Sequence, residues 1–127
     1  MIEVNDKPIL PEQLIAAVKT TGSGCVVTYV GLIRDNSQGK QVVSVSYHDS
    51  RGDAARQLQA IADEAKQKWP VENVGIFHRT GKLKVGDINL VVAVAAAHRS
   101  EGFAVCQYII DEFKQRLPTK KTETYRM

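Results

Sequence analysis

A nearly continuous apolar run over residues 88–97 limits the folds that this chain can adopt. A strand with one face in water alternates apolar and polar residues, whereas a strand covered on both faces is apolar throughout. The run stops at His98 and Arg99, and it is too short to span a bilayer. We therefore predict a central strand that is buried on both faces of its sheet.

The spacing of apolar residues elsewhere predicts the elements that surround this strand. Helices are expected over residues 11–20, 53–69 and 100–117, and strands over residues 25–34, 42–47 and 74–78. Ser100 is the expected N-cap of the last helix, and Pro118 ends it. The apolar stripe expected on that helix comprises Phe103, Cys106, Ile110, Phe113 and Leu117.

The connections between these elements indicate the fold class. Residues 35–40 form a polar loop that is too short for a parallel crossover, so the strands over 25–34 and 42–47 are most simply hairpin partners. Residues 81–86 are typical of a turn-rich connection, and the residues after Pro118 of a polar tail. No linker divides the chain, so we expect a single domain over residues 1–127, of the α/β (α+β) class with a mixed or antiparallel sheet.

Composition narrows the possible functions. A net charge of +3 is compatible with an anionic small-molecule substrate, and no run interleaves basic and aromatic residues as a nucleic-acid site would. Cys25 and Cys106 lack the spacing of a redox or zinc motif and are expected as reduced core residues. The histidines lack metal-ligand spacing, so no metal or cofactor is expected. The amino-terminal residues carry no targeting pattern, which favours a cytoplasmic protein without membrane contact.

Basic side chains at the ends of the expected elements are the candidates for chemistry. His98 and Arg99 lie between the buried strand and a helix N-terminus, where unpaired N–H groups favour anions. Arg34 stands at a strand end, Lys114 at the border of the apolar helical stripe, and Lys121 in a short basic tail. Taken singly, each has an ordinary explanation as a solvated or snorkelling side chain.

Their joint arrangement resembles the family of molybdopterin synthase catalytic (large) subunits, the MoaE family. The resemblance covers nearly the whole chain through GCVVTYVGLIR (24–34), KWP (68–70), HRTGKLKVGD (78–87), AHRSEGF (97–103), IDEFK (110–114), Pro118 and KTE (121–123). Because several separate motifs occur in the right order and spacing, the match is specific, which a lone His-Arg pair would not be.

The resemblance implies a hammerhead-type α/β fold with an added β subdomain. It implies a homodimer that binds two ubiquitin-like sulfur-carrier subunits, which makes a heterotetramer. The thiocarboxylate at the carrier's C-terminal Gly-Gly would transfer sulfur to cyclic pyranopterin monophosphate and make the dithiolene of molybdopterin. Lys114 and Lys121 are implied to be catalytic. The implied substrate-binding set is Leu32, Ile33, Arg34, His98, Arg99, Lys114, Lys121, Thr122 and Glu123.

Two other functions stay open from the sequence. Lys120 stands where the family commonly has an aromatic residue, and the segment after Tyr47 lacks the usual glutamate. These departures leave room for a non-catalytic paralogue that dimerises and binds the carrier. A small basic nucleic-acid-binding domain is the third possibility, and steep salt dependence of binding would favour it.

Overall fold

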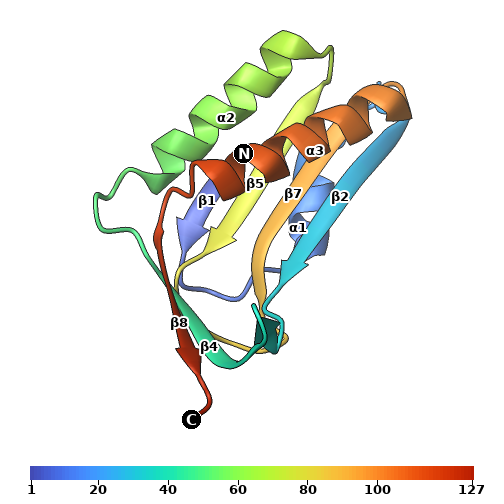
Figure 1. Cartoon of the computed structure of the whole chain (residues 1–127). Helices are drawn as coiled ribbons and strands as arrows, with labels where there is room; N and C mark the ends of the chain where they lie inside the picture. The colour runs from blue at the N-terminus through green and yellow to red at the C-terminus, as the bar shows by residue number, and fades with distance from the viewer.

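The computed structural model describes residues 1–127, and its main sheet is built around the apolar run (Figure 1). Strand β7 (Ile88–Ala96) pairs antiparallel with β5 (Asn73–Arg79) on one side and with β2 (Cys25–Leu32) on the other. Strand β1 (Ile2–Asn5) is a parallel partner of β5, which gives the mixed order β1-β5-β7-β2. The prediction of a central strand buried on both faces is confirmed, because β7 is buried along nearly its whole length.

Helices cover both faces of the main sheet (Figure 1). On one face α1 (Pro11–Val18) inserts Leu14 and Val18 into a small core. On the other, α2 (Ala54–Lys68) and α3 (Arg99–Gln115) pack over the larger core. None of these helices combines the length and the apolar character that crossing a membrane requires.

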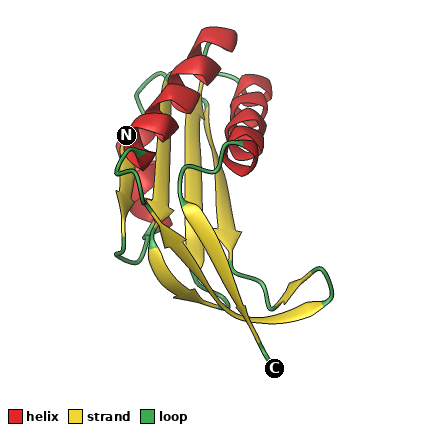
Figure 2. Cartoon of the chain, turned by 60° about the vertical axis from the view of Figure 1, so that its left-hand side comes forward, coloured by secondary structure: helices red, strands yellow, loops and turns green.

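A second, smaller sheet lies at one end of the main sheet (Figure 2). Its central strand β4 (Lys40–His48) pairs antiparallel with β3 (Asn36–Ser37), β6 (Gly81–Lys84) and β8 (Lys120–Tyr125). This sheet has its own core, and Leu117 packs against both that core and the larger one. The expected α+β class, with a mixed main sheet and an added β part, is confirmed.

The predicted hairpin between residues 25–34 and 42–47 is wrong. Strand β2 pairs with β7 instead, and β4 belongs to the second sheet. The tight turn in this region joins β3 to β4, where Ser37 faces Lys40 and the two turn residues Gln38 and Gly39 both have positive φ. Two-residue hairpin turns of this type require positive φ at both turn residues. The predicted polar loop therefore contains β3 and the turn of the β3–β4 hairpin.

The segments 81–86 and 118–125 are also not what the sequence predicts. The turn-rich connection contains β6 and the polar tail contains β8, and both are edge partners of β4. The glycine and lysines of β6 have little preference for strands, so its extended form depends on the β4 edge that it pairs with. Strand β8 contains Thr122, Thr124 and Tyr125, which favour strands, but its charged residues give it the composition of a polar tail.

The last helix begins and packs differently from the expectation. His98, not Ser100, is the N-cap, and the Ser100 hydroxyl bonds the Glu101 carboxylate at 2.9 Å. Phe103 is 60% exposed, and the buried positions are Gly102, Val105, Cys106, Ile109 and Phe113. A Cβ at Gly102 would lie 2.9 Å from the Val27 side chain, so this glycine lets the helix approach β2 and turns Phe103 outward. Cys25 and Cys106 are both free, but only Cys106 lies in the core as expected, while Cys25 is half-buried. Burial raises the pKa of the Cys106 thiol to about 11.

Candidate active site

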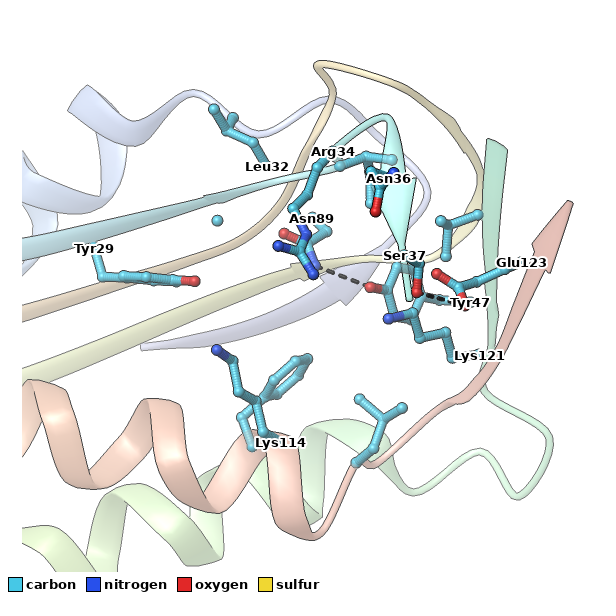
Figure 3. A pocket seen from close by; sticks show the side chains of 15 residues that line it. Tyr29, Leu32, Arg34, Asn36, Ser37, Tyr47, Asn89, Lys114, Lys121 and Glu123 are labelled. Carbon is cyan, nitrogen blue, oxygen red and sulfur yellow. Dashed lines mark hydrogen bonds between the residues drawn. The ribbon is translucent and has the colours of Figure 1, made fainter. Parts of the chain in front are cut away.

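An open cavity of about 610 Å³ lies where the main sheet meets the second sheet (Figure 3). The end of β2, the start of β7 and the last turn of α3 form it on one side, and β3, β4 and β8 close it on the other. The cavity therefore collects residues that lie more than 80 positions apart in the sequence, between Tyr29 and Glu123.

Arg34, Lys114 and Lys121 bring positive charge to this cavity from three different elements. In Figure 3 the Arg34 guanidinium and the Lys114 amine point into the same space. All three residues are exposed, and none belongs to an ion pair of the structure. Three cations beside a single carboxylate leave the open cavity with an excess of positive charge, which favours an anionic ligand that can take charge-assisted hydrogen bonds from them.

Strand alternation on β8 decides which tail residues reach the cavity. Lys121 and Glu123 lie opposite Tyr47 and Val45 of β4, and all four line the cavity. Thr122 lies between them and faces the other side of the sheet, since successive strand residues point to opposite faces. Of the tail residues expected in the site, the cavity lining includes Lys121 and Glu123 but not Thr122.

Glu123 is the only carboxylate in the cavity lining, and the protein holds it in place. Its Oε1 accepts hydrogen bonds from the hydroxyls of Tyr125 at 2.8 Å and Ser37 at 3.3 Å. The Tyr125 bond first, then the Ser37 bond and the charges of Lys121 and Arg34, lower the pKa of this carboxyl. Glu123 therefore ties β8 to β3 and balances part of the positive charge beside Lys121.

His98 and Arg99 lie away from this cavity within the same copy of the chain. His98 is the N-cap of α3 and Arg99 is its first residue, whereas Lys114 stands in the last turn of that helix. Strand β7 runs from Asn89, in the cavity, across the sheet to Ala96, so the two basic residues that follow it emerge at the far end. Leu32, Ile33 and Arg34 line the cavity as expected, and His98 and Arg99 do not.

Neutral polar residues that were not predicted from the sequence also line the cavity: Tyr29, Asn36, Ser37, Tyr47 and Asn89. The Asn89 amide nitrogen donates to the Tyr47 hydroxyl at 3.0 Å. Burial raises the pKa of Tyr47, so the phenol stays protonated. A signal for Asn89 was present, because it is the single polar residue in an otherwise apolar strand.

A buried histidine supports this side of the cavity. The His78 ring packs edge-on against Tyr47 and Phe113, each with a 5.0 Å centroid distance. Its Nδ1 lies 2.9 Å from the Asn89 carbonyl, and its Nε2 lies 2.8 Å from the Thr119 hydroxyl. Since a carbonyl only accepts, Nδ1 carries the proton, and Nε2 accepts from Thr119. This neutral ring joins β7 to the residue just before β8, which carries Lys121.

Acidification is expected to destabilise the protein through His78, because burial lowers the pKa of this ring. The unfolded chain binds a proton as the pH falls below about 6.5, while the folded state stays neutral to lower pH. The unfolded state then binds more protons, so the free energy of unfolding falls by up to about 1.4 kcal/mol per pH unit below that value. Urea unfolding of the wild type, His78→Gln and the exposed-residue control His48→Gln between pH 7.5 and 5.5 measures this. Equal pH slopes in the wild type and His78→Gln would contradict it.

The fold and the cavity define a class: a small α/β protein with a cation-rimmed cavity between two sheets, an arrangement that suits an anionic small molecule. The sequence profile described as the MoaE protein matches residues 4–116. The chain therefore belongs to the MoaE family.

Individual relatives agree with this assignment. The molybdopterin synthase catalytic subunit of Thermoplasma volcanium is 34% identical over 96% of this chain and 89% of its own length. The subunit of the same name from Nostoc is 38% identical over 94% of this chain and 73% of its own length. The crystal structure of molybdopterin synthase from Staphylococcus aureus superposes with a TM-score of 0.91 at 30% identity, over 98% of this chain and 90% of that one.

Proposed function

We propose that this chain is the catalytic subunit of a molybdopterin synthase, a sulfurtransferase that makes the dithiolene of molybdopterin. The observation that carries the proposal is the convergence of Arg34, Lys114 and Lys121 on one open cavity. The names of the relatives support the same activity. The substrates are cyclic pyranopterin monophosphate and the thiocarboxylated C-terminal Gly-Gly tail of a small ubiquitin-like carrier.

The chemistry of this transfer suits the residues of the cavity. The cyclic phosphate is anionic, and Arg34 with the two lysines can hold its oxygens through charge-assisted hydrogen bonds. Attack by the thiocarboxylate sulfur, opening of the phosphate ring and release of the carrier carboxylate all move protons and develop negative charge. The Lys114 and Lys121 amines can donate those protons and stabilise that charge. Leu32, 57% exposed at the cavity, offers apolar contact to the carrier tail, and the buried Ile33 beside it supports the cavity wall.

We propose further that a second copy of the chain supplies His98 and Arg99 to each cavity. Strand β2 is an edge of the main sheet, and its Val30 and Leu32 are 40% and 57% exposed. A two-fold contact along this edge is self-complementary and runs antiparallel. It would place the Leu32 end of one β2 beside the Cys25 end of its partner, next to the residues that follow Ala96. Such a homodimer, with two carriers, forms the heterotetramer.

Residues 1–127 are proposed to act as one domain in the cytoplasm. Leu117 packs against the cores of both sheets, and the cavity draws on both, so neither sheet alone would hold the site.

The test of the proposed function is direct conversion. The purified protein is mixed with thiocarboxylated carrier and cyclic pyranopterin monophosphate, and dithiolene product is measured. Product formation is expected with the thiocarboxylate and not with the carboxylate form of the carrier. Carrier binding without product would identify the non-catalytic paralogue, which the replacement of an aromatic residue by Lys120 still permits.

A further inference from the structure

Asn89 is a polar side chain that the roles described above leave unused. It is the one polar residue of β7, whose sequence is INLVVAVAA. A polar group in a buried strand costs free energy unless it is hydrogen-bonded, so an asparagine here needs a physical reason.

A β-bulge turns this side chain toward the cavity. Gly31 pairs with Leu90 and Leu32 pairs with Ile88, so Asn89 is the extra residue of the β2–β7 ladder. Regular alternation is broken at the same place, since Ile88 packs on the α1 side of the sheet while Leu90 packs under α2 and α3. Bulges of this kind redirect a side chain and are common beside active sites.

One end of the Asn89 amide is held by the protein and the other end is not. The nitrogen donates to the Tyr47 hydroxyl at 3.0 Å. The oxygen Oδ1 is buried without a hydrogen-bond partner, and it is the only buried side-chain nitrogen or oxygen in the chain of which this is true. Because nearly all buried polar side-chain atoms in proteins are paired, an unpaired acceptor at a cavity calls for a donor from outside the chain.

Gly31 leaves the space next to Asn89 Oδ1 open, because it has no side chain. A Cβ at Gly31 would lie 2.8 Å from Oδ1 and 3.3 Å from the Tyr29 hydroxyl oxygen, closer than side-chain carbons normally approach. Figure 3 shows the Tyr29 ring directed toward the same part of the cavity as Asn89, with Arg34 and Lys114 on either side.

The other groups of the cavity are less suited to this task. Arg34, Lys114 and Lys121 only donate hydrogen bonds. The Glu123 carboxylate already accepts from Ser37 and Tyr125, and the Asn36 side-chain oxygen accepts from the Gly39 amide at 3.3 Å. Oε2 of Glu123 has no donor within the chain either, but it is not buried, so Oδ1 of Asn89 is the only buried side-chain acceptor of the cavity without a donor.

We infer that Asn89 positions the heterocyclic ring of the substrate, with Oδ1 accepting a hydrogen bond from an N–H group of the pterin. This inference rests on the proposed function, and it divides the cavity into two parts. The cations hold the phosphate, while the Asn89 amide, fixed by Tyr47, determines which ring edge faces inward. Asn89 is thus a positioning and specificity residue that takes no part in the proton transfers.

Asn89→Leu is the main test, because leucine keeps the approximate volume and removes both polar atoms. It is expected to weaken the binding of unphosphorylated pterin about tenfold, the loss that one buried hydrogen bond corresponds to. The affinity for inorganic phosphate should not change. With the full substrate, KM should rise by a similar factor while kcat stays within about twofold. Gln59→Leu, an amide replacement on the exposed face of α2, is the matched control.

Gly31→Ala tests the same contact with Asn89 in place, since its methyl group would cover Oδ1. If circular dichroism shows that Asn89→Leu does not fold, the Gly31→Ala variant becomes the deciding test of the inference. The same selective loss of pterin affinity is expected. Unchanged pterin affinity in a folded Asn89→Leu variant would overturn the inference, even if the wild type is a fully active synthase. A wild type that binds pterin but makes no dithiolene would refute the proposed function and leave the Asn89 comparison decisive. A wild type that binds no pterin would refute both.

Discussion

Lys114→Met is expected to lower the turnover rate about 10²–10⁴-fold, the range typical of losing a proton-transferring group. Methionine keeps an unbranched stem of similar length, so folding and carrier binding should be unaffected. Lys114→Arg should not restore the rate, because a guanidinium stays protonated and cannot exchange a proton. Single-turnover kinetics with thiocarboxylated carrier, alongside circular dichroism and a carrier-binding titration, measure these effects.

Lys120→Met is the matched control for this variant. Lys120 precedes Lys121 on β8, lies opposite His48 and is absent from the cavity lining, so its loss removes the same charge from the other face of the sheet. Its turnover rate should equal that of the wild type. If Lys114→Met keeps full activity, Lys114 is a snorkelling lysine at the edge of the core and not a catalytic group.

Arg99→Ala is expected to weaken substrate binding about 10- to 150-fold, because a charge-assisted hydrogen bond is worth about 1.5–3 kcal/mol. The effect is notable because Arg99 lies away from the cavity in its own copy of the chain. Arg56→Ala, which removes an exposed arginine of α2, should leave binding unchanged. Calorimetric titration or the substrate dependence of the rate measures both.

Mixing the Arg99→Ala and Lys114→Met variants tests whether Arg99 acts across a dimer. A mixed dimer would contain one cavity with both residues intact, so random assembly should recover about a quarter of wild-type activity. Recovery is not possible if Arg99 serves the cavity of its own copy. A strictly monomeric mass by light scattering at micromolar concentration, or a mixture no more active than its components, would contradict the dimer.

The sequence predicted the parts of the fold that depend on burial and local spacing. The apolar run defined β7, and the helical periodicity defined α2 and most of α3, because burial leaves few alternatives at those positions. Strands β6 and β8 were missed because their charged residues give them the composition of a turn-rich connection and a polar tail. The predicted pairing of β2 with residues 42–47 was wrong because β2 pairs with the distant strand β7, and no local sequence pattern indicates such a pairing.

The cavity was predictable in part for similar reasons. Arg34, Lys114 and Lys121 could be proposed from motif resemblance, and they do line one cavity. Thr122 could be assigned only once the β8 register was known, because a shift of one residue reverses the face. Asn89 could not be assigned from alternation, since it reaches the cavity through a bulge.

The central place of β7 also determines the order in which the chain can fold during synthesis. Strand β2 is completed at residue 32, yet its only partner in the main sheet spans residues 88–96. While the ribosome makes the intervening segment, β2 has no native partner, and its β-branched, apolar residues remain open to pairing with other nascent chains. Release of β7 then closes the β5–β7 and β2–β7 ladders together. Until β7 has been synthesised, the nascent chain therefore depends on protection from aggregation.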